Sequence, residues 1–234
     1  MEVAGLAVEV VRKRMRTIRL TVSPPEGGVR VSAPLRASDA DVRSMVLERL
    51  DWIARHRERM LARPRPAPLR LESGEPLRHL GRVCRLEVAE RPGRPAVRLE
   101  EREQGPVLTF RLPPGADEAA RWRALWRWQK DRLAECIPPL LEKWQPVLGV
   151  RADSWAIRRM KSRWGTCSLR SRRITLGLAL VERPPACLEY VVVHELAHLI
   201  ERGHNARFYA VLDRALPGWR AVRRSLAEDL PGAE

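Results

Sequence analysis

The stretch 190-YVVVHELAHLIERGHNARF-208 constrains the fold more than any other part of the chain. His194 and His198 are four residues apart, so on an α-helix their side chains project from one face, about 6 Å apart along the axis. Two imidazoles placed in this way can bind one Zn²⁺ ion, which takes nitrogen ligands in a tetrahedral shell. Glu195 leans toward the same side and can take a proton from a water held at the metal. The pattern therefore predicts a metal centre on one face of a helix.

A third protein ligand is expected, because catalytic zinc normally has three and keeps one position open. His204 is our predicted third ligand, because Gly203 before it can end the helix in a left-handed conformation and turn the chain back. Glu201 is the rival, but three residues after His198 it remains on the helix. The predicted ligands are His194, His198 and His204, and the predicted catalytic base is Glu195.

The charge of the chain points to anionic partners without specifying one. The formal net charge of the 234 residues is +15 at pH 7, which attracts polyanions such as nucleotides or nucleic acid. A compositional bias toward arginine is the simpler explanation, because acidic residues are interspersed along most of the chain, as on a solvated mixed surface. We therefore expect any nucleic-acid contact to be non-specific.

Cysteine spacing and hydropathy bear on the compartment. The four cysteines are far apart and form no CxxC pair, which argues for a reducing compartment and against a disulfide framework. The N-terminal stretch MEVAGLAVEVVRKRMR has its basic residues after its apolar part, the wrong order for a signal peptide. No apolar run approaches the roughly 18 residues needed to span a bilayer. We expect a cytoplasmic protein with no membrane segment.

Residues 1–115 have the pattern of a β-rich region with one helix. The segments 17–22 and 29–33 alternate polar and apolar residues around a turn at 24–28, which predicts a hairpin. A single helix is predicted from Ser38 onward, and the proline-rich residues 63–68 should end it. Further strands are predicted around residues 82–88, 96–99 and 107–112. We detect no internal repeat, and we expect the isolated His56 and His79 at the surface.

From Asp117 onward, helical spacing dominates. Apolar residues recur up to Leu148, which predicts a long helix or a helix pair that Pro138 and Pro139 must kink or split. Its tryptophans are expected in the core. Strands are predicted over 154–161 and 173–181, separated by a loop-like RWGTCSLRS. The HELAH helix should run to Gly203, and helices should follow over 206–215 and 219–227. The predicted fold class is α+β.

Two further segments accompany the HELAH stretch. Residues 157–168 read IRRMKSRWGTCS, and Phe208 follows four residues after His204. With YVVVHELAH, they resemble the I-R-x-M-K-S-R-W-G-S-C-S, Y-V-V-x-H-E-L-A-H and H-S-x-x-F motifs of the YgjP-like metallopeptidase domain family, a branch of the zincins. The likeness covers most of the chain and is strongest from about residue 150 to 220. Three positions depart from the family pattern, and none is a predicted ligand: Thr166, Gly177 and Asn205.

The resemblance implies a zincin-like catalytic domain at residues 116–234, made of a long helix, a small sheet and the HExxH helix. It implies that the three histidines bind zinc and that Glu195 is the base. Zincins place a sheet beside the active-site helix, so the basic segment 151–183 would border the cleft. Lys161, Arg163 and Trp164 are then candidate substrate contacts, although Trp164 could equally shape a turn that supports the helix.

Three functions follow as hypotheses. The leading one is a zinc-dependent metallopeptidase that cleaves a protein or peptide substrate. The second keeps the metal chemistry but acts on an anionic nucleotide, with Arg158, Lys161 or Arg163 neutralising the leaving group. The third is a nucleic-acid-associated protease, although the chain has no zinc finger or RNA-binding motif. The sequence does not specify an oligomeric state.

Overall fold

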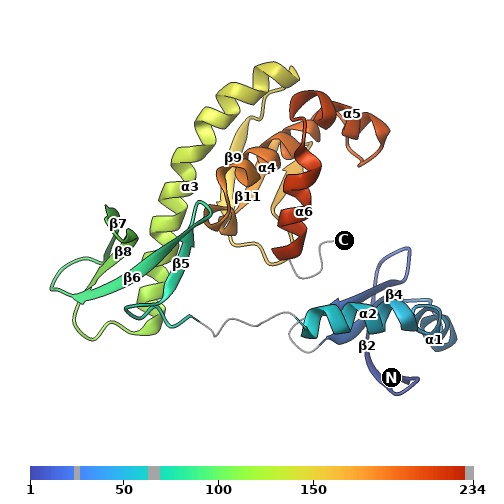
Figure 1. Ribbon diagram of the computed structural model, residues 1–234. Helices are drawn as coiled ribbons and strands as arrows, with labels where there is room; N and C mark the ends of the chain where they lie inside the picture. Colours follow the sequence, from blue (N-terminus) through green and yellow to red (C-terminus); the bar gives the residue numbers. More distant parts are fainter. Residues whose placement is uncertain (24–26, 63–68, 230–234) are drawn as a thin grey trace. The chain divides into compact units, whose positions relative to one another are not determined.

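The computed structural model describes residues 1–23, 27–62 and 69–229, which form two compact units, residues 1–62 and residues 69–229 (Figure 1). The architecture is α+β, as the sequence predicts. The turn residues 24–26 and the proline-rich residues 63–68 lie outside the described residues. The boundary between residues 115 and 116 stays a prediction. No helix in the described part of the chain is both long and apolar enough to cross a membrane.

The first unit is a four-stranded sheet packed against two helices. The strand order is β1-β2-β4-β3, with β2 and β4 parallel and both outer pairs antiparallel. Successive strand residues face opposite sides, so Val29, Val31 and Ala33 of β4 point inward and are buried with Val46 and Ile53 of the helices. The bounds are β1 Glu2–Val3, β2 Leu6–Lys13, β3 Arg19–Ser23, β4 Gly28–Pro34, α1 Asp39–Leu47 and α2 Leu50–Leu61.

The single helix predicted after Ser38 is two helices in the structure. Ser38 begins α1 with a capping box, in which its hydroxyl accepts from the Asp41 N–H and the Asp41 carboxylate accepts from the Ser38 N–H. The helical path breaks at Arg49, whose φ and ψ of −118° and 15° are not helical. Both helices still bury apolar side chains against the sheet. The apolar spacing therefore continues across the break, and the sequence pattern does not reveal it.

The second unit begins with another four-stranded sheet, in the order β5-β6-β8-β7. Its inner face buries Leu86, Leu108 and Phe110 against Ala124 and Leu125 of helix α3. The bounds are β5 Pro76–His79, β6 Arg82–Glu90, β7 Ala96–Arg102, β8 Gly105–Leu112 and α3 Glu118–Leu148.

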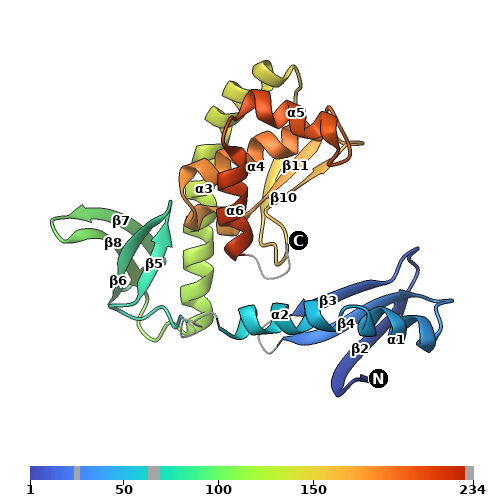
Figure 2. The same cartoon turned by 45° about the vertical axis from the view of Figure 1, so that its right-hand side comes forward.

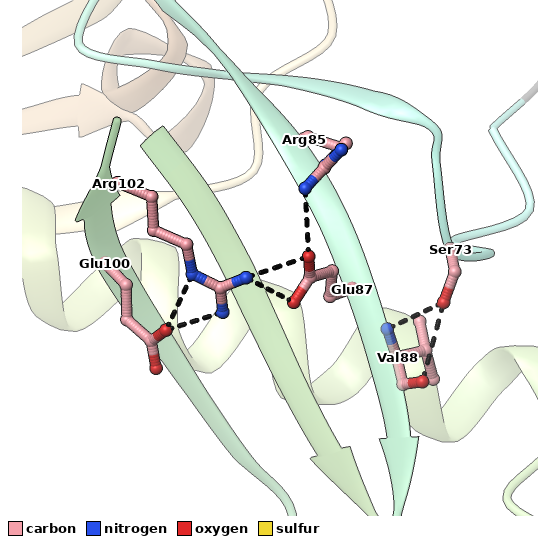
Figure 3. Close-up of polar contacts among 6 residues, drawn as sticks. All are labelled: Ser73, Arg85, Glu87, Val88, Glu100 and Arg102. Atoms are coloured by element: carbon pink, nitrogen blue, oxygen red, sulfur yellow. Dashed lines mark hydrogen bonds and ion pairs between the residues drawn. The ribbon is translucent and has the colours of Figure 1, made fainter. Parts of the chain in front are cut away.

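The outer face of this sheet is charged (Figure 3). Arg102 of β7 forms an ion pair at 2.7 Å with Glu100 on the same strand, and it reaches across β8 to form another at 2.9 Å with Glu87 of β6. Glu87 also contacts Arg85 at 3.2 Å, and Ser73 accepts a hydrogen bond from the Val88 N–H at 2.9 Å. Exposed pairs of this kind add little stability. They mark the face that points to solvent, opposite the face that α3 covers.

The two four-stranded sheets share one topology, a repeat that the sequence pattern does not reveal. In both, the first and second strands pair antiparallel, the second and fourth parallel, and the third and fourth antiparallel. Each first hairpin turns on two residues with positive φ, Ala4-Gly5 and Leu80-Gly81, the conformation of a type I′ turn. After the fourth strand of each sheet, the chain forms a turn and then a helix capped by a side chain, that of Ser38 in the first unit and that of Asp117 in the second. The sequences differ in most positions, so periodicity alone misses the repeat.

The long helix α3 joins two hydrophobic clusters. Its 31 residues correspond to about 46 Å of α-helix. The first part of α3 lies along the second sheet and the later part lies along the last part of the chain, as Figures 1 and 2 show. Leu133, Ile137 and Trp144 of the later part pack in the core of that last part. The helix is not split at Pro138 and Pro139. Both prolines are exposed, so water can satisfy the carbonyl groups that lose their partners.

The last part of the chain is a three-stranded sheet with three helices and a 3₁₀ turn. The sheet order is β10-β11-β9, with β10 antiparallel and β9 parallel to β11. The prediction of a loop over RWGTCSLRS is wrong in part, because Gly165–Ser168 form β10. Buried and exposed positions do not alternate along this strand, so the sequence carries no strand pattern there. The bounds are β9 Ser154–Arg158, β10 Gly165–Ser168, β11 Arg173–Gly177, η1 Leu178–Glu182, α4 Pro185–Ala197, α5 Ala206–Ala215 and α6 Trp219–Asp229.

His79 is buried, which corrects its expected place at the surface. It is 6% exposed, and its ring lies 4.8 Å from that of Trp128 on α3. The hairpin it belongs to is held against η1, where the Leu80 N–H donates to the Val181 carbonyl at 2.7 Å. An isolated histidine gives no sequence signal for such a tertiary contact.

Candidate metal centre

The structure brings the three predicted histidine ligands together. The ligand atoms of His194, His198 and His204 all lie within 4.8 Å of one another. His194 and His198 project from the end of α4, and the two Nε2 atoms of His194 and His204 are 3.1 Å apart. Among the described residues, the group of potential metal ligands does not include Glu201, the rival ligand from the sequence.

The second ring nitrogen of two of these histidines is engaged elsewhere. The Nδ1 atom of His194 is 3.4 Å from the hydroxyl of Tyr190, one turn earlier on α4. The Nδ1 atom of His198 is 3.2 Å from the carbonyl oxygen of Glu201. A ligating histidine usually donates this second N–H to such an acceptor, which fixes the ring and its tautomer. Both rings are thereby oriented with Nε2 free to coordinate.

The chain reaches the third histidine by a different route from the one predicted. Helix α4 ends at Ala197, where the Leu199 and Ile200 N–H groups make tighter bonds three residues back, and not at Gly203. His198 keeps helical angles, so it remains one turn from His194. Gly203 has no positive φ and makes no left-handed turn. Instead the next helix begins immediately after His204, capped by Asn205, whose side chain accepts from the Phe208 N–H at 3.1 Å.

Phe208 forms an apolar floor beneath the three imidazoles. Its ring is fully buried and lies between 4.7 and 5.0 Å from the rings of all three histidines. The sequence indicated this residue only through its place in the H-S-x-x-F motif that the family resemblance supplied. The contact restricts the rings to orientations in which their nitrogen atoms converge.

The electrostatics of the site favour neutral imidazoles. Burial, with the neighbouring His198, His204 and Arg223, lowers the pKa of His194 to about 3. Burial and the same kinds of neighbour also lower the pKa of His204. The neutral form is the one that binds a metal, so these rings need not release a proton first.

Glu195 is held against the backbone of strand β10. The residue is 4% exposed, and burial raises the pKa of its carboxyl group to about 8, with Arg163 opposing the rise. A Cβ atom at Gly165 would lie 2.6 Å from the Glu195 Oε1 atom, so only glycine leaves room for the carboxylate. A carboxyl group with a raised pKa can take up a proton near neutral pH.

The three candidate substrate contacts lie in the connection from β9 to β10. Lys161 and Arg163 are exposed, and the effect of Arg163 on the pKa of Glu195 places its charge near that carboxylate. Trp164 is half-buried, and its indole N–H donates to the Leu226 carbonyl of α6 at 3.2 Å. This bond is the contact expected of a supporting residue. Tyr190, Gly165 and Phe208 were not predicted as part of the site.

The donor set fits a tetrahedral metal ion. Two nitrogen atoms that each lie 2.0–2.1 Å from one tetrahedral metal are about 3.3 Å apart, close to the 3.1 Å between the Nε2 atoms of His194 and His204. Three converging imidazoles are ligands that suit zinc.

Comparisons with known proteins agree with this chemistry. A family model described as "YgjP-like, metallopeptidase domain" matches residues 16–229. The chain is 32% identical over 121 residues to the UTP pyrophosphatase of Escherichia coli, an alignment that covers 47% of this chain and 69% of that protein.

Two solved structures of metallopeptidase zymogens are also similar. Abylysin of Pyrococcus abyssi is 25% identical, over 41% of this chain and 95% of that one, with a TM-score of 0.37. Jannalysin of Methanocaldococcus jannaschii is 18% identical, over 39% and 93%, with a TM-score of 0.35.

Proposed function

Because this chain belongs to the YgjP-like metallopeptidase domain family and is a metal-dependent hydrolase, we propose that it is a zinc enzyme that hydrolyses nucleoside triphosphates. The ligands in this proposal are His194, His198 and His204, and the base is Glu195. The observation that carries it is the convergence of three imidazoles beside the buried carboxyl group of Glu195. When bound, zinc would lower the pKa of water and polarise the electrophile.

The residues of the chain account for the proton and charge transfers. Glu195 takes a proton from the attacking water as the water oxygen bonds to the α-phosphorus. The bond from that phosphorus to the α–β bridging oxygen breaks, and its electron pair leaves with pyrophosphate. Arg163, close enough to act on the pKa of Glu195, is positioned to neutralise negative charge that develops on the phosphate oxygens. The products are a nucleoside monophosphate and pyrophosphate.

The choice of a nucleotide over a peptide is supported by the relative that acts on UTP. Arg163, one of the basic residues that the sequence indicated for such a substrate, also supports it through its effect on the pKa of Glu195. The net charge of +15 favours association with polyanionic substrates in general.

Peptide hydrolysis is the second candidate, and one structural feature favours it. In the described part of the chain β10 is an edge strand, and its Gly165 lies against Glu195. An extended peptide could add to such an edge by main-chain hydrogen bonds, which would bring its carbonyl groups past the base. The same Glu195 and histidines would then act on an amide.

A direct comparison separates the two candidates. Zinc-loaded wild-type protein should release pyrophosphate from UTP and leave a peptide library uncleaved, while Glu195→Gln should bind zinc but lose turnover. Cleavage of peptides with no release of pyrophosphate would replace the first candidate by the second. A fully active Glu195→Gln variant would remove Glu195 from the mechanism in either case.

The proposal includes a cytoplasmic location. No disulfide joins any of the four cysteines, and a reducing compartment is compatible with such a chain. Contact with nucleic acid, if it occurs, is expected to follow from the net charge and to weaken steeply with salt.

A further inference from the structure

Helix α6 is fixed against the metal centre at two points. Trp219 near its start is 2% exposed, and its ring stacks on that of Tyr190 at 6.0 Å with an angle of 3° between the planes. Near its end, Leu226 is also 2% exposed and accepts the hydrogen bond from Trp164. The segment between these anchors therefore has a defined position beside α4.

Arg223 lies between the two anchors, one helical turn after Trp219. Its guanidinium is 5.9 Å from the centre of the Trp219 ring, which restrains the side chain. Its positive charge contributes to the lowered pKa of His194 and of His204. The Trp219 ring next to this guanidinium stacks on Tyr190, whose hydroxyl is 3.4 Å from the Nδ1 atom of His194, so Arg223 lies on the side of α6 that faces the metal centre.

The neighbouring arginine on the same helix shows a different arrangement. Arg220 forms an ion pair with Asp213, including a contact of 3.2 Å between Nη2 and Oδ2. Arg223 is exposed, and within residues 1–23, 27–62 and 69–229 the structure records no ion pair for it. An exposed guanidinium that lies beside a metal centre and has no recorded carboxylate partner is available to bind an anion.

We propose that Arg223 forms an anion-binding subsite that holds a phosphate group of the substrate beside the three-histidine centre. The planar guanidinium offers paired N–H donors that match two phosphate oxygens, and it lies 5.9 Å from the centre of the Trp219 ring. This inference rests on the proposed nucleotide function and adds the group that receives the phosphate chain. Arg163, near Glu195, would supply a second positive charge to the phosphate groups of the same substrate.

The test measures binding separately from turnover. Full-length zinc-loaded protein carrying Glu195→Gln is titrated with inorganic tripolyphosphate, UTP and uridine by calorimetry. Adding Arg223→Gln should weaken the binding of tripolyphosphate and UTP about tenfold or more, because a charge-assisted bidentate contact is lost. Uridine binding should not change, and Arg223→Lys should restore part of the affinity. Zinc content and thermal unfolding show that each variant is folded.

The matched control is Arg224→Gln, which removes the same charge from the adjacent exposed position. This variant should bind tripolyphosphate nearly as well as the parent, because a solvated charge farther from the ligand is screened by salt. If Arg223→Gln and Arg224→Gln lose the same amount of tripolyphosphate affinity, the loss reflects only the change in net charge, and the subsite is overturned. Unchanged tripolyphosphate binding in Arg223→Gln would overturn it too, even if the wild type hydrolyses UTP. Wild-type protein that cleaves only peptides would instead count against the proposed function.

Discussion

Replacing Gly165 by alanine should disable Glu195 without disturbing the metal ligands. The new Cβ atom would lie 2.6 Å from the Glu195 Oε1 atom and 2.9 Å from its Cγ and Cδ atoms. An ordinary contact begins at 3.4 Å, so the carboxylate must move by about 0.8 Å, the difference between 3.4 and 2.6 Å. A displacement near 1 Å in a catalytic group lowers turnover on the order of 100-fold. The overpacking itself should cost about 1–3 kcal/mol of stability.

The assay compares kcat, zinc content and thermal unfolding of Gly165→Ala with those of the wild type, using the substrate that the wild type hydrolyses. Gly28→Ala is a matched control, because among the described residues no atom beyond its chain neighbours lies within 4 Å of its added Cβ atom, and its φ is not positive. We expect Gly165→Ala to bind zinc normally and to lose kcat, and Gly28→Ala to keep both. Wild-type kcat in a folded, zinc-loaded Gly165→Ala variant would refute the role given to the carboxylate at this position.

Two further predictions concern the supports of the site. Tyr190→Phe removes the hydroxyl that orients His194 and should weaken zinc binding roughly tenfold, measured by competition with a chelator; an unchanged affinity would count against this orienting role. Hydrogen bonds from Lys143 and Trp144 hold the pKa of the Glu189 carboxyl group below its usual 4.5. These bonds therefore stabilise the fold fully above pH 4.5, and their contribution is lost as the pH falls through the lowered pKa. Glu189→Gln should therefore destabilise the protein by about 1 kcal/mol at pH 7, and urea unfolding should show the difference shrinking in acid.

The convergence of the three histidines could be predicted from the sequence because their geometry is local. Four residues of helix place His194 and His198 side by side whatever surrounds them, and the short offset to His204 limits where that residue can go. The contacts that tune the site were missed because they depend on segments far apart in the chain. Gly165 meets Glu195 only after β10 has paired with β11, and α6 packs beside α4 where Trp219 stacks on Tyr190.

The fold was predicted to a similar extent. Element type followed from periodicity, and helix 206–215 was predicted with its observed bounds. The predicted end of α4 at Gly203 was too late. The helix ends at Ala197, where backbone hydrogen bonds to residues three back replace the α-helical pattern. The first two strands and the repeated sheet topology were missed, because alternation of short strands is weak when neither face is fully apolar.

Helix α3 has a consequence for any attempt to dissect the chain. Its first half completes the cluster under the second sheet, and its second half completes the cluster around the histidines. A shortened chain that starts at residue 116 would keep the histidines but leave the partly buried Trp122 and Trp128, with Leu125, bare on the helix surface, which favours aggregation. A chain that starts at residue 69 would cut through none of the three hydrophobic clusters. Soluble expression should therefore depend on keeping the second sheet with the hydrolytic centre.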